Sequence, residues 1–185
     1  ITINVDANCT ISIENNSIDD GSSDPDGDEI TYSLSSNGPF TVGTHQVTMT
    51  VTDTSGETDS VDATITVIDS TPPAVITQPL SVNLDASGNV SITAAQINNG
   101  SSDNCAIESM SLDVTSFTCA NIGENTVTLT VTDTSGNTAT QTAIVTVSDH
   151  IAPTVIKQLI SVSFDDSGNE SITAPQVDMG SYDNC

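Results

Sequence analysis

Two segments of the chain alternate strictly between apolar residues and threonine, at 47–52 and at 127–132. Their apolar members are Val47, Met49, Val51, Val127, Leu129 and Val131. Because successive side chains of a β-strand point to opposite faces, a period of two predicts two strands that are each buried on one face. Both segments run into the same six residues, Val-Thr-Asp-Thr-Ser-Gly, at 51–56 and 131–136. The sequence therefore predicts one strand-and-turn element that occurs twice.

Other segments recur at the same interval of about 80 residues, so the chain is built from repeats. Residues 73–78 match 153–158, and Ser-Asp-Asn-Cys at 102–105 matches Tyr-Asp-Asn-Cys at 182–185. The expected repeats are residues 1–70 (without a first strand), 71–150 (complete) and 151–185 (the N-terminal part of a third). Since the pattern is interrupted at both ends, we expect the chain to be a piece of a longer protein.

Segments that contain proline connect the repeats, at 69–73 and 149–153. Proline fixes φ and donates no hydrogen bond to a sheet, so these connections are expected to be short, stiff joints. Within a repeat, clusters of Asp, Asn, Gly and Ser separate about seven short strands, and the pattern predicts no helix longer than a turn or two. The closing strand should pair with the strand before the repeated turn. Its inward residues would be Ala63, Ile65 and Val67 in one repeat and Ala143, Val145 and Val147 in the next. These features favour an all-β fold of tandem β-sandwich modules of about 80 residues.

The charge balance excludes some partners. Of 185 residues, 25 are acidic and one is basic, which gives a formal net charge of −24. Binding to phosphate needs clustered Lys and Arg, so nucleic acid and anionic membrane surfaces are poor partners. No apolar run reaches the roughly 18 residues that a transmembrane helix needs, and we expect no direct insertion into a membrane.

Three features together resemble hyalin-type repeats: the Asp-x-x-x-Pro joint, the Val-Thr-Asp-x-Ser-Gly-Asn turn and the Ser-Ser-Asp-Asn-Cys segment. These repeats are immunoglobulin-like β-sandwiches found in tandem on secreted and surface proteins. The fuller spelling Ser-Gly-Asn, Ser-Ile-Thr-Ala and Gly-Ser-Ser-Asp-Asn-Cys is similar to repeats of very long surface adhesins of gliding Bacteroidetes. The resemblance implies a stiff stalk or filament in an extracellular, cell-surface adhesin, used in adhesion or gliding motility. Its partners would be neighbouring repeats of the same chain, with surface glycans or proteins as further candidates.

Cys105 and Cys119 are predicted to form a disulfide, because the corresponding positions of the first repeat have both lost cysteine. Two free buried thiols remain the alternative. Cys185 matches Cys105, so its partner is expected outside the chain. In related repeats a cysteine at the place of Cys9 pairs with the final strand, where this chain has Val61. Cys9 is therefore expected to be a free, buried thiol or to pair outside the chain.

The segment Asp24-Pro-Asp-Gly-Asp28 is a candidate calcium loop. The carboxylates of Asp24, Asp26 and Asp28 stand at alternate positions around a turn, and hard oxygen ligands on a flexible loop suit Ca²⁺. The segment resembles the acidic loops of cadherin-like and other tandem sandwich modules, which bind calcium. The alternative is a solvated acidic turn, because Asp, Pro and Gly all favour turns.

A second candidate set lies at the joints. Asp69 and Asp149 end one repeat, and Asp103 and Asp183 lie in a loop of the next, so each pair is a candidate to share an ion across a joint. The alternative is that these residues cap turns. Asp53 and Asp133, in the repeated turn, are interpreted as turn formers whose side chains bond to the backbone, with calcium binding as the alternative.

Catalysis finds little support in the sequence, and we expect no enzyme. His45 and His150 stand alone among Thr and Asp, and no nucleophile motif accompanies either residue. Two other functions stay open at this point. One is a module that binds glycans or a protein partner through its Thr-rich faces or acidic loops. The other is the accessory stalk of a secreted hydrolase.

Overall fold

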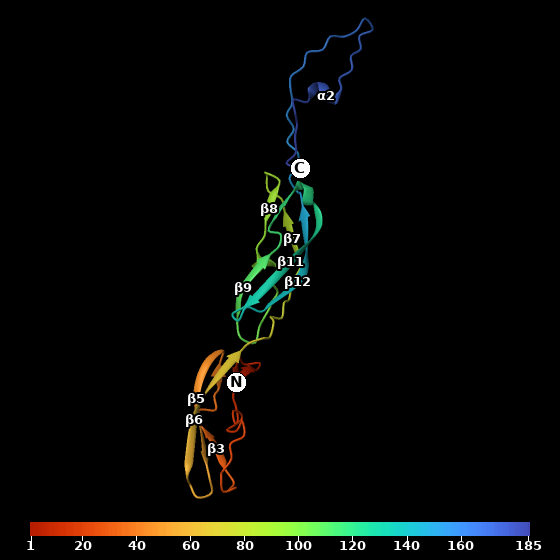
Figure 1. Ribbon diagram of the computed structural model, residues 1–185. Helices are drawn as coiled ribbons and strands as arrows, with labels where there is room; N and C mark the ends of the chain where they lie inside the picture. Colours follow the sequence, from red (N-terminus) through yellow and green to blue (C-terminus); the bar gives the residue numbers. More distant parts are fainter. The chain divides into compact units, whose positions relative to one another are not determined.

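The computed structural model describes all residues from Ile1 to Cys185. The chain forms two compact units. Unit 1 consists of residues 1–75, 100–110 and 130–140, and unit 2 of residues 76–99, 111–129 and 141–185. The structure is all-β apart from three single turns of helix (Figure 1). These are α1 (Ala94–Ile97), the 3-10 helix η1 (Cys119–Asn121) and α2 (Ala174–Val177).

The first repeat contains six strands: β1 (Thr2–Asn4), β2 (Thr10–Ile11), β3 (Thr31–Leu34), β4 (Phe40–Thr41), β5 (Gly43–Thr52) and β6 (Thr58–Ile68). One sheet has the order β1-β6-β5-β3, with β1 parallel to β6 and the other pairs antiparallel. A second sheet pairs β2 with β4. The buried core combines Phe40 of the small sheet with Val47, Ile65 and Val67 of the large one. The two sheets therefore enclose one sandwich core.

The second repeat has the same order of strands: β7 (Leu80–Asn83), β8 (Asn89–Ser91), β9 (Ile107–Leu112), β10 (Ser116–Thr118), β11 (Gly123–Asp133) and β12 (Thr138–Ser148). Its sheets are β7-β12-β11-β9 and β10-β8, so each strand takes the place of its counterpart in the first repeat. The expected fold class is confirmed: the chain is all-β, with β-sandwich modules of about 80 residues.

The alternating segments are strands with one buried face, as expected. Val47 and Met49 of β5 are buried, and so are Val127, Leu129 and Val131 of β11. In the closing strands the buried residues are Ile65, Val67, Ala143, Val145 and Val147. The closing strand β6 pairs antiparallel with β5 over ten residues, from Gly43 opposite Val67 to Thr52 opposite Thr58.

The second repeat has six strands where about seven were expected. Residues 74–78 form only two isolated bridges, Ala74 with Ser102 and Thr77 with Asn98, instead of a strand. Prolines flank this segment at 73 and 79, and proline cannot donate to a sheet ladder. Residues 151–185 carry two isolated bridges and α2, and no strand. The repeat boundaries at 70 and 150 stay a prediction.

The repeated turn has the chemistry expected of it. The Asp133 Oδ1 atom accepts hydrogen bonds from the backbone N–H groups of Ser135 at 2.9 Å and Asn137 at 2.8 Å. Gly136 follows with φ of +89°, a conformation that favours glycine. In the first copy, Asp53 accepts from the N–H of Glu57 at 2.8 Å. Both aspartates are turn formers, as the sequence indicated.

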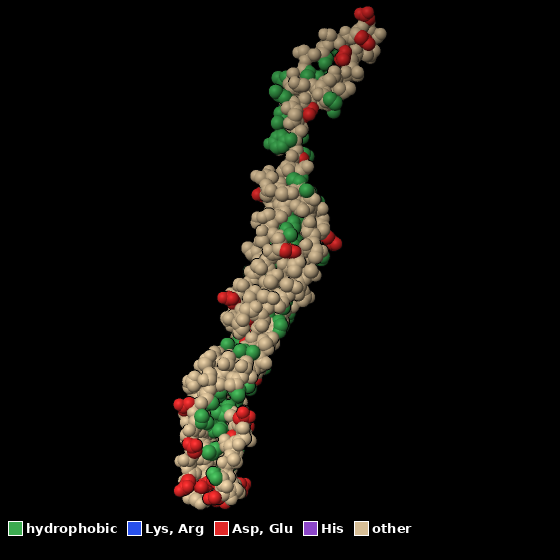
Figure 2. Space-filling view, viewed as in Figure 1, with side chains coloured by type: hydrophobic (Ala, Val, Ile, Leu, Met, Phe, Trp, Pro, Cys, Tyr) green, Lys and Arg blue, Asp and Glu red, His purple; other side chains and the backbone are tan.

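Acidic side chains are spread over the surface (Figure 2). In the first repeat they gather where the loop at 24–28 approaches the β5–β6 turn, and the Thr54 hydroxyl donates to Asp28 Oδ2 at 3.1 Å. None of the helical turns has the length and apolar character needed to cross a lipid bilayer.

Candidate functional site

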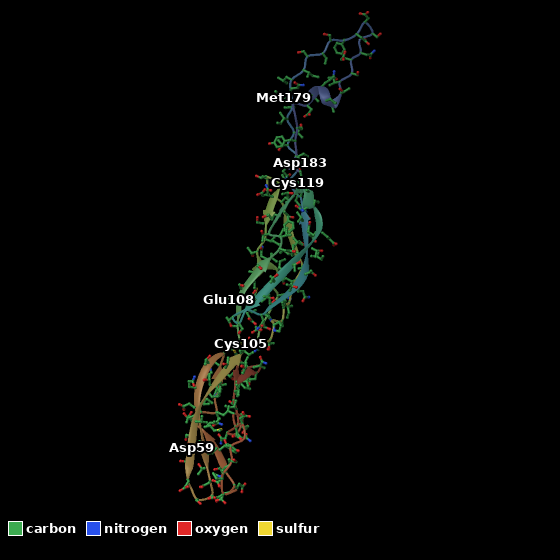
Figure 3. All side chains as sticks on the ribbon, viewed as in Figure 1. Asp59, Cys105, Glu108, Cys119, Met179 and Asp183 are labelled. Carbon is green, nitrogen blue, oxygen red and sulfur yellow. A yellow bond between two sulfur atoms is a disulfide. The ribbon has the colours of Figure 1, made fainter.

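The two disulfides join pairs that the sequence did not indicate, and the predicted pair of Cys105 with Cys119 is wrong. Cys9 is bonded to Cys105, and Cys119 is bonded to Cys185, so no cysteine is free. The expectations that Cys9 and Cys185 lack a partner within the chain are corrected by the same bonds. Figure 3 labels one cysteine of each pair, Cys105 and Cys119.

The reason lies in the strand between Cys105 and Cys119. β9 occupies six of the intervening residues and carries the chain about 20 Å along the sheet. A disulfide tolerates a Cα–Cα separation of only about 4.4–6.8 Å. Cys105 lies beside Asp69 and Asp103, whereas the Cys119 sulfur lies 3.2 Å from the backbone oxygen of Asn184. The short sequence interval between the two cysteines therefore does not bring them together.

Each disulfide lies at a joint between repeats. We call residues 6–9, 69–73 and 102–105 the first joint, and residues 85–89, 149–153 and 182–185, together with Cys119, the second joint. All residues of the first joint belong to unit 1, and all residues of the second belong to unit 2. The same three segments thus come together twice along the chain.

In each joint one cysteine comes from the Asp-Asn-Cys segment, and the other comes from a different place. In the first joint the partner is Cys9, in the turn after Asp6, with φ of +59°. In the second joint the same turn carries Gly88, with φ of +72°, and the sulfur comes from Cys119, the first residue of η1, directly after β10. A Cβ placed on Gly88 would lie 2.7 Å from that sulfur. Both arrangements place a sulfur atom of the disulfide at the same turn, the one that follows Asp6 or Asp85.

In the first joint, carboxylates of Asp69 and Asp103 converge. These two residues and Cys105 each place one potential ligand atom within 4.8 Å of the others. The Cys105 sulfur is already used in the disulfide and is not a thiolate, so the carboxylates are the ligand groups of this cluster. The structure therefore brings together Asp69 and Asp103, as the sequence predicted for this joint.

Asn104 completes the cluster, although the sequence pattern did not single it out. Its Nδ2 atom donates to the backbone oxygen of Asp6 at 3.3 Å and to Asp69 Oδ1 at 3.4 Å. Asp69 Oδ1 also accepts from the N–H of Thr71 at 3.0 Å, and Asp103 Oδ2 accepts from the N–H of Cys105 at 2.8 Å. The recurrence of Asp-Asn-Cys at 183–185 was the signal that pointed to this asparagine.

The second joint repeats these contacts. Asn184 Nδ2 donates to the backbone oxygen of Asp85 at 3.3 Å and to Asp149 Oδ1 at 3.2 Å. Asp149 Oδ1 accepts from the N–H of Ile151, and Asp183 Oδ1 from the N–H of Cys185, both at 3.0 Å. The hydrogen bond from Ile151 lowers the pKa of the Asp149 carboxyl, and the contacts with Asn184 and Asp183 lower it further.

The repeated turn of the second repeat also reaches the first joint. Asn137 Nδ2 donates to Asp133 Oδ2 at 2.8 Å and to the backbone oxygen of Asp69 at 3.1 Å. Asp133 is fully buried. Burial acts to raise the pKa of its carboxyl, but the hydrogen bonds from Asn137 and Ser135 outweigh burial and hold the pKa below its usual value. The turn therefore buries a charged carboxylate next to the joint.

The loop at 24–28 forms an Asx-type turn. Asp24 Oδ1 accepts from the N–H of Asp26 at 2.8 Å and from that of Asp28 at 3.4 Å. Asp24, Asp26 and Asp28 do not form a cluster of the kind seen at the first joint. Calcium binding by these three residues stays a prediction.

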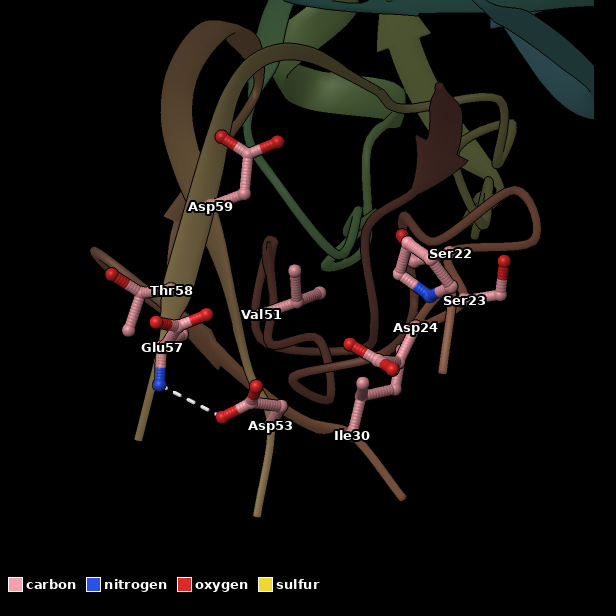
Figure 4. Close-up of a pocket in the computed structure, with 10 residues that line it drawn as sticks. Ser22, Ser23, Asp24, Ile30, Val51, Asp53, Glu57, Thr58 and Asp59 are labelled. Carbon is pink, nitrogen blue, oxygen red and sulfur yellow. Dashed lines mark hydrogen bonds between the residues drawn. The ribbon is translucent and has the colours of Figure 1, made fainter. Parts of the chain in front are cut away.

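A cavity of about 440 Å³ lies beside this loop, between it and the β5–β6 hairpin (Figure 4). Four acidic residues line it: Asp24, Asp53, Glu57 and Asp59. His45 lies elsewhere, where its Nε2 atom is 2.7 Å from the backbone oxygen of Thr41 and its ring lies 5.0 Å from that of Phe40. These contacts indicate that His45 packs within the first repeat.

Comparison with known proteins finds no matching family and no matching curated relative. Solved structures do show likenesses. Human mucin-like protocadherin EC1-2 is 14% identical, with a TM-score of 0.37, over 80% of this chain and 95% of that one. Protocadherin gammaB7 EC3-6 is 18% identical, with a TM-score of 0.33, over 76% of this chain and 46% of that one. An endo-fucoidan hydrolase of glycoside hydrolase family 107 is 15% identical, with a TM-score of 0.28, over 66% of this chain and 29% of that one.

Proposed function

We propose that this chain is a tension-bearing structural segment of an extracellular, cell-surface adhesion protein. The observation that carries the proposal is the order of the two disulfides along the chain. The bond from Cys9 to Cys105 closes before the bond from Cys119 to Cys185 begins, so the two loops follow one another without overlap.

This order creates a short covalent path from one end of the chain to the other. The path runs through residues 1–9, across the first disulfide, through residues 105–119, and across the second disulfide to Cys185. A force applied to the two ends therefore cannot extend either disulfide-closed loop as long as both bonds are intact. Apart from β1, β9 and β10, the strands of both sandwiches lie in those loops, so the intact bonds protect them from being stretched out. This is the property that a stalk under tension needs.

The location and partners in the proposal have separate support. Disulfides persist in oxidising compartments, and all four cysteines are paired, which supports an extracellular location. Each joint connects a loop of one repeat to the adjacent repeat. This supports neighbouring repeats of the same chain as the immediate partners. Three further parts of the proposal rest on the resemblance of the sequence alone. They are membership of the hyalin-type repeats, a role in gliding motility, and surface glycans or proteins as the adhesion ligand.

Single-molecule pulling from the two ends of the chain tests this function. With both disulfides intact, we expect the fully stretched chain to span roughly 100 Å, because only residues 1–9 and 105–119 can extend at about 3.5 Å each. With a reductant present, the same chain should reach more than roughly 600 Å. An extension of several hundred ångströms under oxidising conditions would overturn the proposal.

Matched cysteine variants separate the two loops. Cys9→Ser with Cys105→Ser opens the first loop, and the expected span is roughly 400 Å. Cys119→Ser with Cys185→Ser opens the second loop, and the expected span is roughly 300 Å. A disulfide between Cys105 and Cys119 would instead leave nearly the full length free in the unmodified chain, so the measurement also distinguishes the two pairings.

A further inference from the structure

We propose that each joint binds a divalent cation of the calcium type. The ligands in the first joint are Asp69, Asp103 and Asn104, and those in the second are Asp149, Asp183 and Asn184. This inference deepens the proposed function, because the cation would fix the same joints through which the covalent path runs.

Three side-chain oxygen atoms of the first joint lack a hydrogen-bond partner. Asp69 Oδ2, Asp103 Oδ1 and Asn104 Oδ1 are all buried, and none of them accepts a hydrogen bond. Asp69 as a whole is only 6% exposed. Buried polar atoms in folded proteins are almost always paired, so three unpaired oxygens from adjacent side chains require an explanation.

Hydrogen bonds hold each of these three side chains at one end. In each of them the other polar atom is engaged: Asp69 Oδ1 by Thr71 N–H, Asp103 Oδ2 by Cys105 N–H, and Asn104 Nδ2 by the Asp6 carbonyl. One end of every side chain is thus fixed, and the remaining oxygen is left over. This is the arrangement of a preorganised ligand, in which outer hydrogen bonds orient the groups that bind the ion.

The charge around the first joint favours a cation. The only Lys or Arg of the chain is Lys157, which belongs to unit 2, so unit 1 contains neither. Two carboxylates within 4.8 Å of one another repel, and burying an unpaired carboxylate costs several kcal/mol. Asp133, whose buried carboxylate lies one hydrogen bond further away through Asn137, adds to the negative potential. A bound cation supplies the positive charge that the side chains of unit 1 do not.

The second joint repeats the hydrogen bonds around the asparagine, although its Asp183 is exposed. Asn184 Oδ1 is buried without a partner, as Asn104 Oδ1 is, and its Nδ2 atom bonds to Asp149 and to the Asp85 carbonyl. Asp183 is fixed through the N–H of Cys185 as Asp103 is through Cys105. The same unpaired amide oxygen occurs at both joints, which indicates that both joints need a ligand at this position.

The donor set selects the ion. Carboxylate and amide oxygens are hard ligands, and the sulfur atoms beside them are locked in disulfides. Ca²⁺ accepts six to eight oxygen ligands in flexible geometry and is often completed by water, which suits ligands from loops. Mg²⁺ demands a near-ideal octahedron and gives up its water reluctantly.

Calorimetric titration of the oxidised, chelator-treated chain with CaCl₂ tests the inference. We expect saturable binding of Ca²⁺ that Mg²⁺ does not reproduce at the same concentration. Asp69→Asn and Asp103→Asn should each weaken one site by about 100-fold or more while leaving the other intact. Asp149→Asn should do the reverse. Asp62→Asn is the control, because Asp62 is exposed on β6 and contacts only the Thr48 hydroxyl among side chains.

Two results would overturn the inference: no uptake of Ca²⁺ by the unmodified chain at millimolar concentration, or uptake that Asp24→Asn abolishes and the joint variants do not. Should a joint variant fail to fold, the anomalous signal of calcium in crystals of the unmodified chain locates the ions directly. The proposed stalk function is judged separately, because the short covalent path survives in chelator as long as the disulfides do. Failure of calcium binding therefore leaves the pulling experiment unaffected.

Discussion

Gly88 lies against the sulfur of Cys119, and a Cβ on Gly88 would come within 2.7 Å of it. The counterpart of Gly88 in the first repeat is Cys9, which is itself the disulfide partner of the first joint. Gly88 and Cys9 have similar backbone conformations, with φ of +72° and +59°. The glycine therefore occupies the place where the other joint keeps its cysteine, and it leaves room for a sulfur that arrives from β10.

The first prediction follows from this exchange. A chain that carries Gly88→Cys together with Cys119→Ser should re-form the link to Cys185 from the new position. The left-handed backbone at residue 88 costs a non-glycine residue about 1–2 kcal/mol, which a disulfide offsets. Mass spectrometry of peptides under non-reducing conditions checks the link. Cys119→Ser alone is the control, and its Cys185 should react with an alkylating reagent. Alkylation of Cys185 in the double variant would contradict the prediction.

A second prediction uses the single basic residue. Trypsin has one site, after Lys157, and this site lies between Cys119 and Cys185. We expect the two products to stay together on a non-reducing gel and to separate when the disulfide is reduced. If Cys105 were bonded to Cys119 instead, the C-terminal fragment would leave without reductant. The digest therefore decides between the two pairings with unmodified protein.

The difference between what could be predicted and what could not lies in the range of the interactions. The strands at 47–52 and 127–132 were predictable because alternation and turn chemistry are local properties of the sequence. The pairing of Cys105 was not, because it depends on where the turn at Cys9 comes to lie after both repeats have folded. Sequence spacing favoured Cys119, and the strand β9 overrides that spacing.

The candidate site shows the same division. Asp69 and Asp103 were proposed from the repeat pattern, and the structure places them together. Asn104 was missed because an amide beside an aspartate resembles an ordinary turn residue, and its unpaired oxygen appears only in the folded structure. Comparison of 103–105 with 183–185 contained the signal, since both copies keep Asp-Asn-Cys.

A third prediction concerns the contribution of the first disulfide to stability. Its cysteines are 96 residues apart, so in the chain-entropy account the bond removes freedom from the unfolded chain worth about 4–5 kcal/mol. Cys9→Ser and Cys105→Ser should each lower the free energy of unfolding of unit 1 by about this amount. The double variant should lose no more than either single one, because both remove the same bond. Additive losses in chemical denaturation would show that the two sulfurs act separately.

The fourth prediction is an acid dependence that originates at Asp133. Its pKa in the folded state is lowered, so its carboxylate contributes stability above the unfolded pKa of about 3.9, and this contribution is lost as pH falls through the lowered folded pKa. Asp133→Asn should reduce the free energy of unfolding by about 1–3 kcal/mol at pH 7, through the loss of charge-assisted hydrogen bonds.

The variant should also lose less stability than the unmodified chain when the pH falls below 4. Asp53→Asn, in the other copy of the turn, is the matched control and should have a smaller effect at pH 7. Asp53 is only partly buried, and among side-chain contacts it accepts a single hydrogen bond, from Glu57 N–H. Chemical denaturation at pH 7 and at pH 3, followed by an amide signal of β11, measures both differences. Equal acid sensitivity in Asp133→Asn and the unmodified chain would assign the dependence to other carboxylates.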